Sequence, residues 1–261
     1  MIHSTRHAVP GRNAISEAGE TRVLEDGAST LLFDAAVAGE AQPRWFDIEW
    51  WKAQGRAAPA TAGRGPTWFV GPSGSEWVLR HCHRGGALGY WVADHYLWLG
   101  LEHARPFVEF RFTRRLLALG LPVPRPVAAR VLRAGPVYTG DLITERVAGA
   151  RPVSALLEVA PVPATAWRAI GRCIRRFHDH GVYHADLTAN NILIDGAERV
   201  SVIDFDRGGL REPGAWRTAN LARLQRSLRK ICGELPPDRF GTADWTALQD
   251  AYGSGTGVAS A

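Results

Sequence analysis

The sequence is poor in cysteine and in long hydrophobic runs, and both absences exclude common classes of protein. No run of about eighteen consecutive apolar residues occurs, so no membrane-spanning helix is predicted. The three cysteines, Cys82, Cys173 and Cys232, are widely separated, which fits neither a disulfide framework nor a zinc ribbon. His81 and His83 flank Cys82, but only these two would share one side of a strand. We therefore expect reduced, structural thiols and no metal site at this position.

Lysine is almost absent as well. Lys52 and Lys230 are the only lysines, so the net charge of +5 comes from arginine. A basic surplus predicts attraction to a polyanion such as nucleic acid, anionic lipid or a phosphorylated substrate. Charge alone does not choose among these partners, but the shortage of lysine matters for any site that ordinarily uses one.

Both ends of the chain lack a periodic apolar face. Residues 1–27 are polar and have no apolar core of a signal peptide, which favours a cytoplasmic protein. We expect this leader and the tail at residues 253–261 to be disordered. Between them we predict an N-lobe over residues 28–148 and a C-lobe over residues 149–252, with a cleft where the lobes meet.

The two halves differ in their periodicity. The first half predicts mainly strands, namely a hairpin over 67–70 and 76–80 and strands near 127–132 and 137–145, with one helix over 105–119. The second half predicts helices over 163–180 and 215–231, with two short strands at 192–194 and 200–203. A strand-rich lobe followed by a helical lobe is an α+β arrangement.

The chemistry is concentrated in two nearby motifs. Residues 183–191 read Tyr-His-Ala-Asp-Leu-Thr-Ala-Asn-Asn, and residues 202–208 read Val-Ile-Asp-Phe-Asp-Arg-Gly. The first matches the kinase catalytic-loop pattern at His184, Asp186 and Asn191, and the second places Asp204 where that pattern has its metal-binding aspartate. In this order, the motifs resemble the protein-kinase-like superfamily. The resemblance implies a bilobal fold around an ATP cleft.

Each of these residues suits a role in phosphoryl transfer, which needs a positioned hydroxyl and cations against the phosphate charge. Asp186 can accept the proton of the acceptor hydroxyl as the catalytic base. Asn191 and Asp204 offer oxygen ligands suited to Mg²⁺, so both are predicted metal and nucleotide-binding residues. Asp206 is a candidate for a second metal contact.

The N-lobe should supply a cation for the phosphates of ATP. Because neither lysine lies at the end of the expected third strand, Arg80 is predicted to contact the nucleotide instead. Its expected acidic partner, which completes the nucleotide-binding set, is Glu109, with Glu102 as the rival. A loose phosphate-covering loop is expected near residues 63–65, and the adenine near the backbone of residues 143–147.

Departures from protein kinases narrow the acceptor. Ala185 replaces the arginine that would pair with a phosphorylated activation loop. The segment between Asp206 and the basic helix is short and has no Ala-Pro-Glu anchor, which leaves little room to dock a peptide. A small or lipid-linked acceptor is therefore predicted.

Several further pieces resemble the bacterial 3-deoxy-D-manno-octulosonic acid (Kdo) kinase family. They are Trp45-Phe-Asp47, Gly65-Pro-Thr-Trp-Phe69, Trp77-Val-Leu-Arg-His81, Arg84-Gly-Gly86, Leu121-Pro-Val-Pro124, His184-Ala-Asp-Leu187, Ile203-Asp-Phe-Asp-Arg-Gly208 and Asn220-Leu-Ala-Arg-Leu-Gln-Arg-Ser-Leu-Arg229. The resemblance implies ATP- and Mg²⁺-dependent phosphorylation of the Kdo 4-hydroxyl on a lipid A precursor, during lipopolysaccharide core synthesis. It also implies a peripheral location at the cytoplasmic face of the inner membrane.

The sequence itself suits an anionic membrane surface. The helix expected over 215–231 is basic, and Trp91, Tyr96 and Trp98 are aromatic residues that can lie at a lipid interface. No nucleic-acid recognition module and no protein partner is evident. Three alternatives remain: a lipopolysaccharide heptose kinase, a soluble aminoglycoside- or choline-like kinase, and a pseudokinase scaffold without activity.

Overall fold

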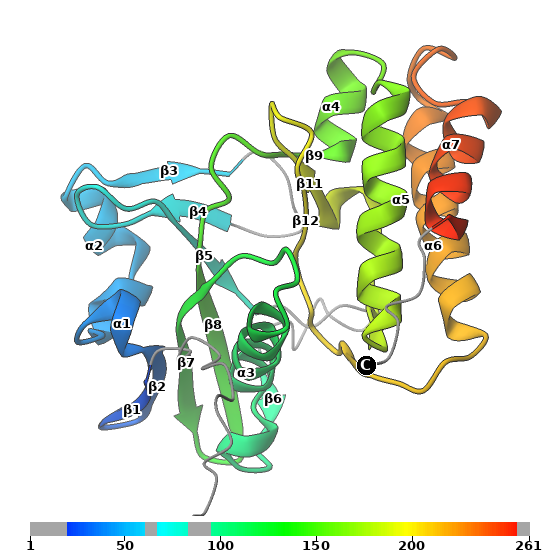
Figure 1. Cartoon of the computed structure of the whole chain (residues 1–261). Helices are drawn as coiled ribbons and strands as arrows, with labels where there is room; N and C mark the ends of the chain where they lie inside the picture. The colour runs from blue at the N-terminus through cyan, green and yellow to red at the C-terminus, as the bar shows by residue number, and fades with distance from the viewer. Residues whose placement is uncertain (1–19, 61–66, 83–94, 255–261) are drawn as a thin grey trace, which may run out of the picture.

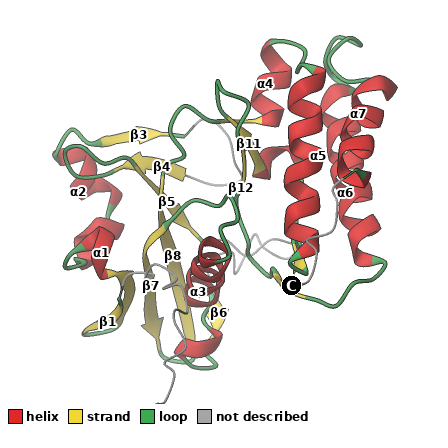
Figure 2. Ribbon diagram, in the orientation of Figure 1, coloured by secondary structure: helices red, strands yellow, loops and turns green. Residues whose placement is uncertain are grey.

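The computed structural model describes residues 20–60, 67–82 and 95–254, and it divides into a sheet-based lobe and a helical lobe (Figure 1). Figure 2 shows the long strands gathered on one side, and most helices on the other side together with a few short strands. This is the α+β, protein-kinase-like arrangement that the sequence predicted. The connection between the two lobes runs through residues 146–150, between the last long strand and the short strand β9.

The N-lobe is built on one antiparallel sheet in the order β1-β2-β7-β8-β5-β4-β3, with β6 added beside β8. Its strands are β1 (Thr21–Asp26), β2 (Ser29–Asp34), β3 (Ala57–Pro59), β4 (Thr67–Val70), β5 (Trp77–His81), β6 (Tyr96–Leu97), β7 (Pro126–Ala134) and β8 (Val137–Glu145). The hairpin of β4 and β5 pairs Thr67 with Arg80, so Arg80 lies near the end of β5 as predicted.

One face of this sheet is covered by short helices that the periodicity did not indicate. They are α1 (Ala35–Ala38), the 3-10 helix η1 (Pro43–Phe46) and α2 (Ile48–Ala53). Asp34 and Asp47 cap α1 and α2 by accepting hydrogen bonds from backbone N–H groups of the first turn. Trp51 and Trp77 pack edge-to-face beneath them in a buried cluster. These helices are too short to show a full apolar stripe.

The opposite face of the sheet carries α3 (Arg105–Ala118), which follows the 3-10 helix η2 (Leu101–His103). Phe107 and Phe110 are fully buried against β7 and β8, and Pro106 at the start of the helix costs no hydrogen bond. The buried phenylalanines fix the rotation of α3 about its own axis. As a result its remaining face, with Arg105, Glu109 and Phe112, is directed toward the C-lobe.

The C-lobe packs its helices around an apolar core that includes Trp167, Ile174 and Leu228. Its helices are α4 (Val153–Val159), α5 (Ala164–Asp179), the 3-10 helix η3 (Ala189–Asn191), α6 (Trp216–Cys232) and α7 (Thr242–Gly253). Its short strands are β9 (Arg151–Pro152), β10 (Val182–Tyr183), β11 (Ile192–Ile194), β12 (Val200–Val202) and β13 (Gly209–Leu210). Gly171 allows α5 and α7 to touch, because a Cβ there would lie 2.2 Å from the backbone oxygen of Leu248.

The described residues correct the predicted leader. Strand β1 lies within the segment 1–27 that was expected to be disordered, and it pairs along its whole length with β2. All its side chains are exposed, so its stability comes from backbone hydrogen bonds. For the same reason its sequence shows no apolar period from which a strand could be predicted. At the other end α7 continues to Gly253, where the tail was expected to begin. Residues 1–19 and 255–261 lie outside the described residues.

Two more observations bear on membrane contact. Among the described residues, no helix is long and apolar enough to cross a membrane. Tyr96, predicted as an interfacial aromatic, is buried, and its hydroxyl oxygen accepts a hydrogen bond from Arg105 Nη1 (2.7 Å), so it is not available to lipid. Trp98 is half-buried against Tyr138, and Trp91 lies outside the described residues.

Candidate active site

A hydrogen-bonded frame joins the two predicted motifs. The buried imidazole of His184 accepts the backbone N–H of Asp186 at Nδ1 (3.0 Å) and donates from Nε2 to the backbone oxygen of Ile203 (2.9 Å). Burial lowers the pKa of His184, which favours the neutral ring that this pattern requires. His184 is therefore a structural bridge between the loop of Asp186 and the residue before Asp204.

Asn191 makes a second bridge between the same segments. Its Nδ2 donates to the backbone oxygen of Asp186 (2.9 Å), and its own backbone oxygen accepts from the N–H of Ile203 (3.0 Å). The amide nitrogen is thus occupied, and Oδ1 is the atom left for a ligand. Asp186, Asn191 and Asp204 are held at one edge of the C-lobe, because the two bridges fix their backbones relative to each other.

Asp204 has unusual geometry. Its φ of 65° lies in the left-handed region, which a side chain other than glycine adopts at a cost of about 1 kcal/mol or more. Its Oδ1 is buried and accepts no hydrogen bond, although Nη1 of Arg80 lies 3.1 Å away. Asp204 thus combines a strained backbone with a buried carboxylate oxygen that accepts no hydrogen bond. Both features are typical of a residue that binds a ligand.

Arg80 connects Asp204 to α3. Its Nη2 donates to both carboxylate oxygens of Glu109 at 2.6 and 2.7 Å, while Nη1 faces Asp204. The planar guanidinium thereby reaches two carboxylates at once. Burial raises the pKa of Glu109, and the Arg80 charge opposes that rise. The predicted pairing with Glu109 is confirmed, whereas the rival Glu102 pairs with Arg111 at the surface.

Three side chains on one face of α3 contact the segment 204–206. Arg105 forms a two-pronged ion pair with Asp206, Glu109 reaches Asp204 through Arg80, and Phe112 packs edge-to-face on Phe205. Their spacing of four and three residues follows the helical repeat. Asp206 was a candidate for a second metal contact, but its carboxylate is already engaged by Arg105.

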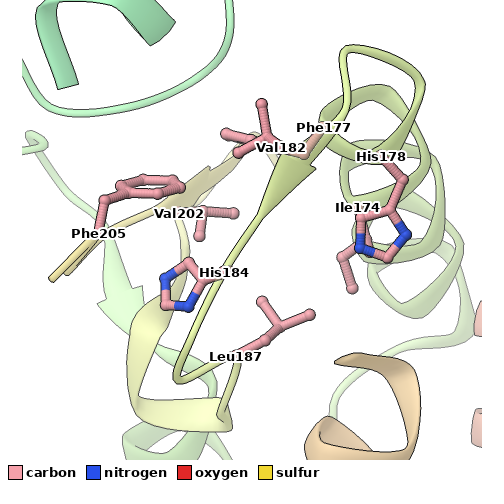
Figure 3. A pocket seen from close by; sticks show the side chains of 8 residues that line it. All are labelled: Ile174, Phe177, His178, Val182, His184, Leu187, Val202 and Phe205. Carbon is pink, nitrogen blue, oxygen red and sulfur yellow. The ribbon is translucent and has the colours of Figure 1, made fainter. Parts of the chain in front are cut away.

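A small apolar cavity lies behind this segment (Figure 3). It is lined by, among others, Phe177, Val182, His184, Leu187, Val202 and Phe205. The Phe205 ring contacts His184 and stacks on Phe177, with centroids 4.8 and 5.7 Å apart. This apolar backing keeps water from the buried imidazole and supports the loop from inside the C-lobe.

Asp186 has a partner that the sequence did not indicate. Arg223 of α6 donates to Asp186 Oδ1 from both Nε (3.0 Å) and Nη2 (2.5 Å). Both side chains are partly exposed, so the pair lies at the edge of the site. Within the part of the chain that the structure describes, Asp186 Oδ2 accepts no hydrogen bond. One oxygen of the carboxylate is therefore available for a substrate hydroxyl.

The donor set fits a magnesium ion held together with phosphates. The described residues contain no cluster of three His, Cys, Asp or Glu side chains, so an all-protein cage is absent from this part of the chain. Mg²⁺ is usually held by one or two carboxylates plus substrate phosphates, which matches one carboxylate and one amide. The charges of Arg80, Glu109 and Asp204 sum to −1, so a divalent cation is favoured beside Asp204.

Sequence reasoning missed Arg105 and Arg223, although each carried a weak signal. Arg105 lies one helical turn before Glu109, so it shares that residue's face of α3. Arg223 was noted only as part of a basic helix. The predicted phosphate-covering loop at 63–65 lies outside the described residues, as does the Arg84-Gly-Gly86 piece.

The Arg105–Asp206 pair yields a prediction about stability. We expect Asp206→Asn to lower the free energy of unfolding by about 1–3 kcal/mol, because it leaves a partly buried arginine without its counter-charge. A double-mutant cycle with Arg105→Gln, measured by urea unfolding, should give a coupling energy of about 1 kcal/mol or more. Glu102→Gln, at an exposed ion pair, is the control and should change stability by less than about 1 kcal/mol. Additive effects of the two substitutions would contradict the coupling.

Known proteins match this chain over most of its length. The model of the "Lipopolysaccharide kinase (Kdo/WaaP) family" matches residues 48–252. A 3-deoxy-D-manno-octulosonic acid kinase of Vibrio cholerae serotype O1 is 39% identical over 81% of this chain and 90% of its own length. Enzymes of the same name from Photobacterium profundum and Actinobacillus succinogenes are 40% and 41% identical, each over 85% of this chain and 94% and 95% of their own lengths.

A solved structure is similar at a lower level. The bifunctional kinase-methyltransferase WbdD aligns with 72% of this chain and 42% of its own chain, at 16% identity and a TM-score of 0.43. The family match and the curated relatives agree with the site geometry, since all point to a phosphotransferase. The chain belongs to the lipopolysaccharide kinase (Kdo/WaaP) family.

Proposed function

We propose that this protein transfers the γ-phosphoryl group of ATP to the 4-hydroxyl of Kdo on a lipid A precursor, during lipopolysaccharide core synthesis. One observation carries the proposal: the frame of His184 and Asn191 fixes the backbones of Asp186 and Asp204 to each other. The shared name of the relatives supports the choice of acceptor.

In this proposal the nucleotide lies between the two lobes. The N-lobe comprises residues 28–148 together with strand β1, and the C-lobe comprises residues 149–252. Arg80, fixed by Glu109, contacts the phosphates and stabilises the charge that develops on them. Asn191 Oδ1 and the Asp204 carboxylate would hold Mg²⁺. When bound, this ion neutralises phosphate charge and orients the phosphoryl group.

Asp186 acts on the acceptor. Its Oδ2 would accept a hydrogen bond from the acceptor hydroxyl and then its proton, as the hydroxyl oxygen attacks the γ-phosphorus. The bond from the γ-phosphorus to the bridging oxygen breaks, and ADP leaves. Arg223 holds Oδ1 from the other side, so the carboxylate cannot rotate freely. The backbone on either side of Asp186 is fixed by His184 and Asn191, which keeps the base in one position before the acceptor arrives.

The location that we propose is peripheral, at the cytoplasmic face of the inner membrane. Arg226, Arg229 and Lys230 are exposed on α6 and would face anionic lipid headgroups. Nothing in this surface resembles a nucleic-acid recognition module, and we propose no nucleic-acid or protein partner.

The test is a panel of acceptors with purified protein, labelled ATP and Mg²⁺. We expect phosphate transfer to the Kdo-bearing lipid A precursor and none to the same lipid without Kdo. A core heptose acceptor and a soluble aminoglycoside serve as the alternatives. Transfer to either of them, with none to the Kdo-bearing lipid, would overturn the proposed acceptor. Nucleotide binding without transfer to any acceptor would favour a scaffold instead.

A further inference from the structure

One face of α6 contacts the loop of the proposed base at three successive points. Asn220 Oδ1 accepts from the backbone N–H of His184 (3.3 Å), and its Nδ2 donates to the backbone oxygen of His184 (2.9 Å). Arg223 pairs with Asp186, and the hydroxyl of Ser227 accepts from the N–H of Ala189 (3.2 Å). The spacing of three and four residues places Asn220, Arg223 and Ser227 on one side of the helix.

These three contacts differ in kind. Asn220 and Ser227 bind backbone groups, and Asn220 is buried, so their roles are structural. Arg223 binds the side chain of the base, and nearly half of its own side chain is exposed, at 46%. In the described part of the chain, its Nη1 makes no hydrogen bond. A guanidinium with a free donor edge beside the reacting hydroxyl is placed to bind a second group.

Arg223 contacts Asp186 from α6, which belongs to the C-lobe. The nucleotide phosphates already have Arg80, which is fixed on the N-lobe side by Glu109. Figure 1 shows α6 on the far side of α5 from the N-lobe sheet. The loop of residues 183–191 contains no arginine or lysine, so it brings no cation of its own to the acceptor. A group bound by Arg223 would therefore belong to the molecule whose hydroxyl meets Asp186.

We propose that Arg223 is a specificity-determining residue that binds the carboxylate of the acceptor sugar while it keeps its hold on Asp186. This inference rests on the proposed function, since an octulosonic acid carries a carboxylate and neutral sugars do not. The fixed fork of arginine suits two planar carboxylates at once: Nε and Nη2 hold Asp186, and the Nη1 edge is left for the substrate. A neutral sugar would leave this edge unpaired, which selects against it.

The test combines a change in the enzyme with a change in the acceptor. Arg223→Gln is compared with the wild type, using the Kdo-bearing lipid and the same lipid with its Kdo carboxylate converted to the carboxamide. For the wild type, the carboxamide should raise the acceptor KM by about 10- to 100-fold. For Arg223→Gln, the KM for the natural acceptor should rise by a similar factor, and the two acceptors should no longer differ. The KM for ATP should stay within about threefold of the wild-type value, because Arg80 serves the nucleotide.

Two further variants serve as controls. Arg223→Lys keeps the positive charge but loses the planar guanidinium. It should therefore retain part of the preference for the carboxylate acceptor over the carboxamide, which Arg223→Gln is expected to lose. Arg168→Gln removes an exposed arginine from α5 and should leave the KM values of both acceptors unchanged. All variants are checked by thermal unfolding, so that a loss of fold is distinguished from a loss of binding.

The outcomes separate this inference from the proposed function. If the wild type phosphorylates the Kdo-bearing lipid but Arg223→Gln still prefers the carboxylate, the inference is overturned and the proposed function stands. An equal fall in kcat for both acceptors, with KM unchanged, would show that Arg223 only positions Asp186, and would also overturn it. If the wild type transfers no phosphate to the Kdo-bearing lipid, both fall together.

Discussion

Replacing Asp186 with asparagine is expected to reduce kcat by about 100- to 10,000-fold, the usual contribution of a positioned base. Asparagine has nearly the same size and can still accept hydrogen bonds from Arg223, but it cannot take a proton at neutral pH. The backbone of residue 186 is fixed by His184 and Asn191 through its N–H and C=O groups, which the substitution does not change. The fold and the affinity for ATP should therefore remain close to those of the wild type.

The measurements are kcat with the Kdo-bearing lipid, ATP affinity by titration with a fluorescent nucleotide, and the midpoint of thermal unfolding. Asp179→Asn, at a carboxylate paired with Arg175 in α5, is the matched control and should keep its kcat. An Asp186→Asn protein whose kcat stayed within about threefold of the wild type would show that another group is the base.

Replacing Asp204 with asparagine should act on a different step. The carboxylate is the one anionic oxygen group that we propose for Mg²⁺, and its Oδ1 now lies buried without a hydrogen bond. Losing it should weaken Mg²⁺-dependent nucleotide binding by about 100-fold, which corresponds to about 2.7 kcal/mol. Arg80 should keep its ion pair with Glu109, so the N-lobe is expected to retain its structure.

The measurement is calorimetric titration with a non-hydrolysable ATP analogue, with Mg²⁺ and then with EDTA. The wild type should bind much more tightly with Mg²⁺, and Asp204→Asn should lose most of that difference. Asp238→Asn, at an exposed carboxylate, is the control and should behave like the wild type. If Asp204→Asn kept the full effect of Mg²⁺, the ion would have to bind elsewhere.

The parts of the site that sequence reasoning predicted are those encoded by contiguous motifs. His184, Asp186 and Asn191 lie within eight residues, and the short strands β11 and β12 carry the chain from this loop directly to Asp204. A motif of this kind fixes both the residue types and their local structure, so the backbone frame follows from it. The pairing of Arg80 with Glu109 was predicted from the resemblance to kinases and the order of elements, with Glu102 as the rival. Arg80 was chosen because no lysine lies at that position.

The parts that were missed depend on contacts between distant residues. Arg105 and Asp206 are 101 residues apart, and Arg223 and Asp186 are 37 residues apart. Neither pair can be predicted from the spacing of residues within one motif or helix. Strand β1 was missed for a different reason. Its side chains are all exposed, and its stability comes from backbone pairing with β2, which leaves no apolar period to read. The helices α1 and α2 are likewise shorter than two full turns.

The most direct test of the account is a structure of the wild-type protein with Mg²⁺ and a non-hydrolysable ATP analogue. We predict that the Asp204 carboxylate and Asn191 Oδ1 ligate the metal, that Arg80 contacts the phosphates, and that Asp186 Oδ2 faces the γ-phosphoryl group with room for one hydroxyl. A nucleotide bound between the lobes with its γ-phosphoryl group beyond the reach of an acceptor held by Asp186, or a metal that Asp204 does not ligate, would contradict it.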